Sequence, residues 1–170
     1  MWEKIKKFIE RALPPGTPSR GILTFFLSGV LACQFYNMVV FWGRFFDKYW
    51  DLFIVEEKIT LLSGELMTDF HLLHGGTLRV HFIYTIISLA LSIYLYSLYH
   101  QGSKSIYLMK RLPNSFEMHR RALTLPFALC ALFLVLAAVS LLANFGLYML
   151  ITPNECIKPL QWQKLWRSLL

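Results

Sequence analysis

The sequence predicts an all-α integral membrane protein with three transmembrane helices, an N-terminal amphipathic helix, a cytoplasmic helix-break-helix and a C-terminal interfacial helix. Three windows without Asp, Glu, Lys or Arg carry this prediction: 23 residues after Arg20, 24 after Arg79 and 33 after Arg121. A helix that crosses a bilayer needs about 20 predominantly apolar residues. The 170 residues are 56% hydrophobic and only 16% charged, whereas soluble domains carry about 25% charged residues. This composition excludes a soluble enzyme, a disordered tail and a disulfide-stapled secreted module.

The elements are expected in one membrane domain, in an order set by hydropathy and proline. Their predicted ranges are an amphipathic helix at 1–13, span 1 at 21–43, an outer loop at 48–75, span 2 at 78–100, a coupling-like cytoplasmic segment at 103–121, span 3 at 122–151 and an interfacial helix at 159–170. At 1–13, apolar residues recur at helical spacing and basic residues lie mostly off that stripe, which suits a helix on the membrane surface. At the other end, Trp162, Leu165, Trp166 and Leu169 repeat the same spacing.

Polar and aromatic residues inside the first and third spans predict how these helices pack. Gln34 and Asn37 lie one turn apart in span 1, and Ser140 and Asn144 form an i, i+4 pair in span 3. In lipid Gln34 and Asn37 prefer another helix, so these two are expected to hold the bundle together rather than to line a transport pathway. The aromatic run at the end of span 1 predicts an interfacial belt, made of Phe41, Trp42, Phe45, Phe46, Tyr49 and Trp50.

The orientation follows from the distribution of basic residues. The N-terminal segment and the connection between spans 2 and 3 are rich in Lys and Arg, whereas the connection at 48–75 is rich in acids. The positive-inside rule therefore places the N-terminus and residues 103–121 in the cytoplasm. Three spans then leave the C-terminal segment outside, although it carries Lys158, Lys164 and Arg167.

The outer connection holds the one cluster of metal-ligating residue types. Asp69, His71 and His74 lie close together in the sequence, and the two histidines could share one helix face. Two histidines and one carboxylate lack the further ligands that a metal site needs, so a polar loop is the preferred interpretation and no metal or cofactor is predicted. Near the same region, Ile54-Val55 and Leu61-Leu62 predict short helices or a packed loop.

The cytoplasmic segment 103–121 is the most informative about function. Pro113 separates two short predicted helices, and Asn114 with Glu117 forms a capping-box pattern at the start of the second. The segment mixes basic and apolar residues, which suits either a headgroup layer or the surface of a partner protein. The predicted partner-binding residues are Tyr107, Met109, Arg111, Phe116, Arg120 and Arg121.

Three stretches carry a resemblance: 102–113 with Glu117-Met118-His119-Arg120-Arg121, the start around Ala12-Leu13-Pro14-Pro15, and 161–167 near the C-terminus. They resemble small, largely uncharacterised multi-span membrane proteins of gut Gram-positive bacteria and, more loosely, ABC-type transporter permeases. That resemblance implies a location in a bacterial cytoplasmic membrane, an elbow helix at 1–13 and a coupling helix within 103–121 that docks on a separate ATPase. Such permeases usually have six spans and this chain has three, which implies a half-size or accessory subunit beside a second permease subunit.

The function expected from these observations is a non-catalytic subunit of an ABC-type transport system, with membrane lipid as its surroundings and no role for nucleic acid. Protease, hydrolase and nucleotide-binding motifs are absent from the sequence, and no acidic residue lies within a span, so no enzyme activity is expected. A stand-alone scaffold or self-associating membrane protein is the alternative. A haem or quinone anchor is less favoured, because His81 and His100 lie at opposite ends of the same span.

Overall fold

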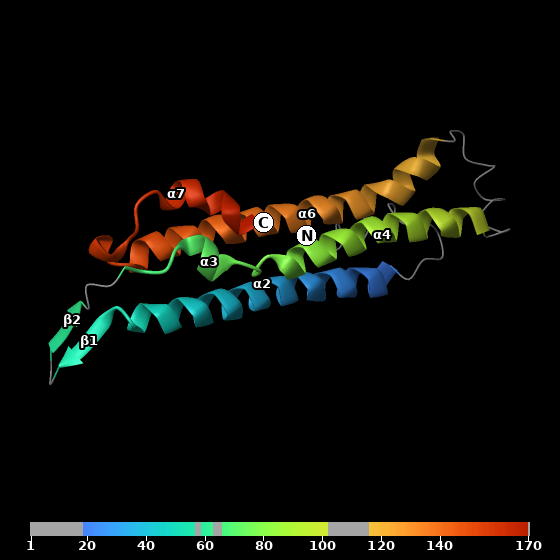
Figure 1. Ribbon diagram of the computed structural model, residues 1–170. Helices are drawn as coiled ribbons and strands as arrows, with labels where there is room; N and C mark the ends of the chain where they lie inside the picture. The colour runs from blue at the N-terminus through green and yellow to red at the C-terminus, as the bar shows by residue number, and fades with distance from the viewer. Residues whose placement is uncertain (1–18, 57–58, 63–65, 102–115, 170) are drawn as a thin grey trace. The chain divides into compact units, whose positions relative to one another are not determined.

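The computed structural model describes residues 19–56, 59–62, 66–101 and 116–169, and three long helices dominate this part of the chain (Figure 1). These are α2 (Ser19–Trp50), α4 (Arg79–Gln101) and α6 (Phe116–Ile151). Each is long and apolar enough to cross a membrane, over Arg20–Trp50, Arg79–Ser97 and Leu123–Ile151. The prediction of three helices long and apolar enough to span a membrane is therefore confirmed, and the predicted helix at 1–13 lies outside the described residues.

The helix ends differ from the predicted spans where charged residues follow an apolar window. Helix α2 continues to Trp50, beyond the predicted end at residue 43, because Arg44, Asp47 and Lys48 end the uncharged window without breaking the helix. Helix α6 begins at Phe116 and runs for 36 residues, which is about 54 Å at 1.5 Å per residue. As expected, it carries over from the segment predicted to be cytoplasmic into the predicted span 3, and Pro126 lies inside it.

The connection between α2 and α4 contains the only strands in the described part of the chain. Strands β1 (Phe53–Glu56) and β2 (Ile59–Leu62) pair antiparallel, with Phe53 opposite Leu62 and Glu56 opposite Ile59. The expectation of short helices or a packed loop here was wrong, because the β-branched residues of this stretch favour a pleated backbone. The short helix α3 (Phe70–His74) follows.

After α6 the chain forms the 3₁₀ turn η1 (Asn154–Cys156), helix α7 (Gln161–Lys164) and a 3₁₀ helix, η2 (Leu165–Leu169). The apolar residues predicted to form one stripe at 159–170 are not all in the same environment. Leu165 is fully buried, whereas Trp162 and Trp166 are exposed. The predicted helical stretch at 159–170 is observed as a short α-helix followed by a 3₁₀ helix, with Leu165 on a buried face and the two tryptophans on an exposed face. The buried face is the one that carries Gln161 and Leu165, and it packs against protein.

The described residues pack as two compact units. One comprises residues up to 31 together with 81–135, and the other comprises 32–80 together with 136–170. In the first unit, the ring of Tyr84 in α4 stacks on Phe133 of α6, with centroids 5.2 Å apart, and Phe26 of α2 packs against Phe133. Gly29 of α2 lies directly against the Tyr84 ring.

In the second unit, an aromatic core joins α2, α3 and α6. Phe41, Phe45, Phe70 and Tyr148 have no exposed surface, and ring contacts link them. Two members of the predicted interfacial belt, Phe41 and Phe45, are therefore core residues. Phe46 and Trp50, on the other face of α2, are exposed and fit the belt. The helical period of 3.6 residues separates one aromatic run into these two faces.

Candidate functional site

The predicted partner-binding residues fall at the start of α6 and in the segment before it. Tyr107, Met109 and Arg111 lie outside the described residues. Phe116, Arg120 and Arg121 lie on the first two turns of α6. They therefore share one continuous helix with the apolar stretch that ends at Ile151.

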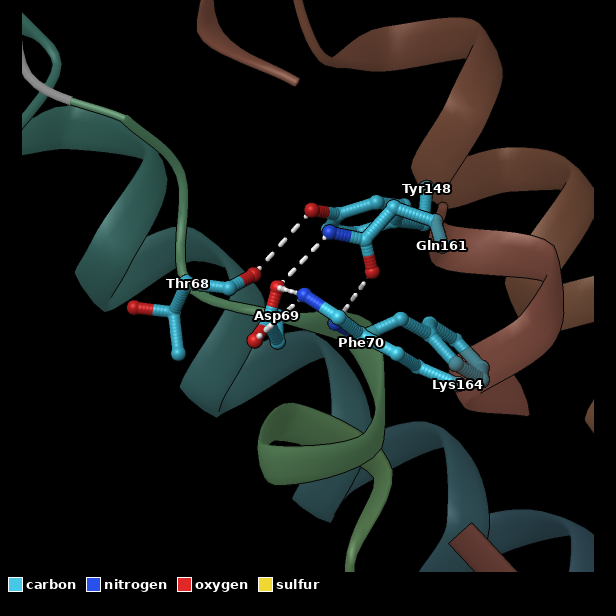
Figure 2. Close-up of polar contacts among 6 residues, drawn as sticks. All are labelled: Thr68, Asp69, Phe70, Tyr148, Gln161 and Lys164. Carbon is cyan, nitrogen blue, oxygen red and sulfur yellow. Dashed lines mark hydrogen bonds and ion pairs between the residues drawn. The ribbon is translucent and has the colours of Figure 1, made fainter. Parts of the chain in front are cut away.

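The best-defined polar cluster lies in the second unit, where the connection before α4 meets the C-terminal segment (Figure 2). We call it the Asp69 cluster; its members are Thr68, Asp69, Phe70, Tyr148, Gln161 and Lys164. The Lys164 ammonium lies 3.1 Å from Oδ1 and 3.2 Å from Oδ2 of Asp69, and Nε2 of Gln161 donates to Oδ1 at 2.8 Å. Three donor contacts therefore converge on one carboxylate.

The side chain of Gln161 uses both ends of its amide. While Nε2 donates to Asp69, Oε1 accepts the backbone N–H of Phe70 at 3.2 Å. Phe70 is the first residue of α3. The backbone N–H groups in the first turn of a helix have no acceptor within that helix, so this one needs a partner from elsewhere. Gln161 is almost fully buried, so satisfying the whole amide avoids the cost of a buried unpaired polar group.

Local backbone structure explains why Gln161 and Lys164 face the same carboxylate. Leu160, which precedes α7, has a φ of 63°, in the left-handed region, and its carbonyl accepts the N–H groups of Gln163 and Lys164. The reversal after Pro159 thus starts a single helical turn. Residues three apart on such a turn lie on one face, which directs Gln161 and Lys164 together toward Asp69.

The electrostatics of the cluster favour an ionised Asp69. Burial by itself would raise the pKa of this carboxyl group, but the hydrogen bonds from Gln161 and Lys164 and the charges of Lys164 and Lys158 outweigh burial and lower the pKa. A carboxylate that is so well stabilised is a weak base. The arrangement therefore acts as a clamp between two segments rather than as a general acid or base.

Two further hydrogen bonds extend this clamp. The Tyr148 hydroxyl of α6 donates to the carbonyl of Thr68 at 3.0 Å, and the N–H of Met67 donates to the carbonyl of Cys156 at 2.8 Å. Together with the Asp69 cluster they attach residues 67–70 to both the end of α6 and the segment after it. The sequence indicated neither Gln161 nor Tyr148, because their partners lie about 80 to 90 positions away in the chain.

The weak metal hypothesis at Asp69, His71 and His74 finds no support in the geometry. The Asp69 carboxylate is bonded to Lys164 and Gln161, while Nε2 of His74 lies 3.0 Å from the Thr77 hydroxyl. The His74 ring also stacks on Phe70. Within the described ranges, no group of three or more His, Cys, Asp or Glu residues could hold a metal ion.

Arg44 is a third residue whose role the sequence did not indicate. From the last part of α2, its guanidinium donates to the carbonyls of Leu73 and Gly75, at 3.3 and 2.6 Å. These carbonyls lie at the C-terminal end of α3, where helical acceptors lack partners. Arg44 therefore fixes the chain between α3 and α4, and its charge has a structural role.

Gln34 and Asn37 of α2 do contact another helix, as predicted, and their partners are Ser140 and Asn144 of α6. The Ser140 hydroxyl donates to Oε1 of Gln34, and Nδ2 of Asn144 donates to Oδ1 of Asn37, each at 3.1 Å. Asn37 and Asn144 are both nearly fully buried. These two bonds connect α2 and α6 at neighbouring turns, which fits a role in helix packing.

Comparisons with protein-family models, with curated proteins and with solved structures found no match.

Proposed function

We propose that this chain is a small, non-catalytic membrane subunit of a transport assembly, which binds a separate cytoplasmic ATPase and a second permease subunit through residues 103–121. The membrane location is supported by three long apolar helices and by the apolar side chains that they present outward. On α2, for example, Leu31, Phe35 and Met38 are 67%, 70% and 62% exposed. Such a surface is unfavourable in water and suits lipid.

One observation carries the assignment of a coupling role. Helix α6 has no interruption between Phe116 and Ile151, so the helix that bears Arg120 and Arg121 is also the third span. A displacement of its first turns by a partner would be transmitted along a single helix. The loosely resembled permeases place a coupling helix in the corresponding position, and this similarity of arrangement supports the proposal as an analogy.

In this role, the basic residues would pair with carboxylates of the ATPase, and the apolar residues of 103–121 would be buried in its surface. Arginine suits such contacts because its guanidinium forms two parallel hydrogen bonds with a carboxylate. The ATP chemistry would belong to the partner. The Tyr148 hydroxyl, which donates to the carbonyl of Thr68, would keep the other end of α6 attached to its neighbouring segment.

The proposal is tested by purifying the tagged protein from its native host in mild detergent and identifying its partners by mass spectrometry. We expect an ATPase and a second permease subunit to co-purify. The double charge reversal R120E/R121E should abolish their recovery while membrane insertion stays intact. The matched control is K48E/R167E, which changes the net charge equally at exposed positions outside the proposed docking segment.

Unchanged recovery with R120E/R121E would contradict the docking role of these arginines. Purification of the chain alone, or only with further copies of itself, would contradict the transport assignment and favour a self-associating scaffold. Equal loss in both double variants would show a general effect of charge and would also contradict specific docking.

A further inference from the structure

A groove in the second unit lies beside the last turns of α6. Its volume is about 580 Å³, within the range of roughly 300–1,000 Å³ found for ligand sites. Helix α6 contributes Phe145 and Met149 to it. The C-terminal segment contributes Ile157, Pro159, Leu160 and Trp162, so most of the lining is apolar.

The walls of the groove are fixed by the contacts that Trp162 and Gln161 make with other residues of the second unit. Trp162 packs on Phe145, with ring centroids 5.5 Å apart, and the adjacent Gln161 is anchored to Asp69 and Phe70. Leu160 keeps its left-handed backbone, and its side chain is exposed. An apolar groove in this setting can accept a ligand without first rearranging.

The place of the groove in the chain corresponds to the end of a membrane-spanning stretch. The apolar stretch of α6 ends at Ile151, and the groove extends from Phe145 within it to Trp162 beyond it. Exposed tryptophans are typical of headgroup depth, and both Trp162 and Trp166 are exposed here. One part of the groove would therefore lie among acyl chains and the other among headgroups.

The charged residue of the groove, Lys158, belongs to the part that would lie among headgroups. Lys158 lines the groove, and its charge acts on Asp69, but the Asp69 oxygens are already bonded to Lys164 and Gln161. Lys158 is the one charged residue among those that line the groove, so the lining carries a positive charge. Glu155, the nearest acid in sequence, is exposed and is not among the residues that line the groove.

We infer that this groove binds one anionic phospholipid, with an acyl chain along the apolar lining and the phosphate beside the Lys158 ammonium. An acyl chain matches the apolar walls of Phe145, Met149 and Trp162, and a negative headgroup matches the positive charge of the lining. This inference does not depend on the proposed transport role.

The test uses quenching of tryptophan fluorescence by brominated acyl chains, in full-length protein in which Trp162 is the only tryptophan and the other four are Phe. The protein is reconstituted in phosphatidylcholine vesicles that contain either brominated phosphatidylglycerol or brominated phosphatidylcholine at the same mole fraction. We expect the relative association constant for phosphatidylglycerol to be about fivefold higher, the factor that one basic residue beside an anionic headgroup contributes. Lys158→Gln should remove this preference, and Lys158→Arg should keep it.

Three controls make the result specific. A variant with Trp166 as its only tryptophan should show no preference, because Trp166 does not line the groove. Arg167→Gln should leave the preference at Trp162 unchanged, and Lys158→Gln should leave quenching by brominated phosphatidylcholine unchanged, which shows that the groove is intact. Equal quenching of Trp162 by both lipids would overturn the inference. So would an equal loss of preference in Arg167→Gln, since that would reflect general surface charge.

Discussion

The Asp69 side chain joins two segments that lie far apart in the sequence. Its carboxylate links the start of α3 to the C-terminal segment through Gln161 and Lys164, and its side chain is only 16% exposed. Most ion pairs on protein surfaces contribute little, because water screens both charges and the side chains lose freedom. Partial burial and the additional hydrogen bond from Gln161 distinguish this pair from the exposed Lys48–Asp51 pair in the same unit.

We therefore predict that Asp69→Asn lowers the free energy of unfolding by about 1–2 kcal/mol at neutral pH, as expected for hydrogen bonds to a charged group. Asp51→Asn is the matched control and should change it by less than about 0.5 kcal/mol, because the Lys48–Asp51 pair is exposed. Unfolding in mixed micelles with a denaturing detergent measures both values. Equal effects of the two substitutions would contradict a special role for the Asp69 cluster.

The pH dependence of this contribution follows from the lowered pKa of Asp69. A carboxyl group whose pKa is lower in the folded state stabilises the fold above its unfolded pKa, about 3.9, and loses this contribution as the pH falls through the folded value. The difference in stability between the native protein and Asp69→Asn should therefore be constant above about pH 5 and shrink in more acidic solution. A difference that grew on acidification would contradict the assignment.

At the scale of elements, the approach of α2 to α4 depends on a glycine. A Cβ added at Gly29 would lie 2.8 Å from Cδ1 and 2.9 Å from Cζ of Tyr84. The Tyr84 ring cannot move away freely, because it stacks on Phe133 of α6. A small residue at this point allows the close helix contact that is typical of membrane bundles.

We predict that Gly29→Ala destabilises the bundle by about 1–3 kcal/mol, the usual cost of overpacking a core. Gly43→Ala in the same helix is the matched control, because a Cβ there meets no atom within 4 Å. It should be neutral or stabilise by up to about 1 kcal/mol, since alanine favours helix more than glycine does. Adding Tyr84→Leu should reduce the effect of Gly29→Ala, and the same detergent titration compares all four proteins. If Gly29→Ala matched the control, the close contact would be refuted.

At the scale of the whole molecule, the contacts of the second unit bear on the orientation in the membrane. The connection that follows α2 and the segment that follows α6 are joined by the bond between Met67 and Cys156 and by the Asp69 cluster. We therefore expect these segments to lie on the same side of a membrane. The C-terminal basic residues, which are unexpected outside the cell, include Lys164, and its charge is balanced by Asp69.

We predict that cysteines at the exposed positions Asp51 and Arg167, introduced singly into a variant without native cysteines, react with a membrane-impermeant maleimide in intact cells. A cysteine at the exposed position Arg20, at the other end of α2, should react only after the cells are opened, because the positive-inside rule places it in the cytoplasm. Mass-tag shifts on a gel report each reaction. Labelling of only one of the first two positions would contradict their common side, and labelling of Arg20 alone would reverse the orientation.

What the sequence by itself determined is the class of protein and the number of spanning helices, because length and hydropathy are local properties of each segment. It also predicted that Gln34 and Asn37 would contact another helix, since lipid acyl chains have no hydrogen-bonding groups. Only the tertiary structure decided which aromatic residues are core and which are surface, and that Gln161 and Lys164 bind Asp69, 92 and 95 positions away. Contacts between residues so far apart depend on how helices and connections pack, and no local pattern of charge or period contains that information.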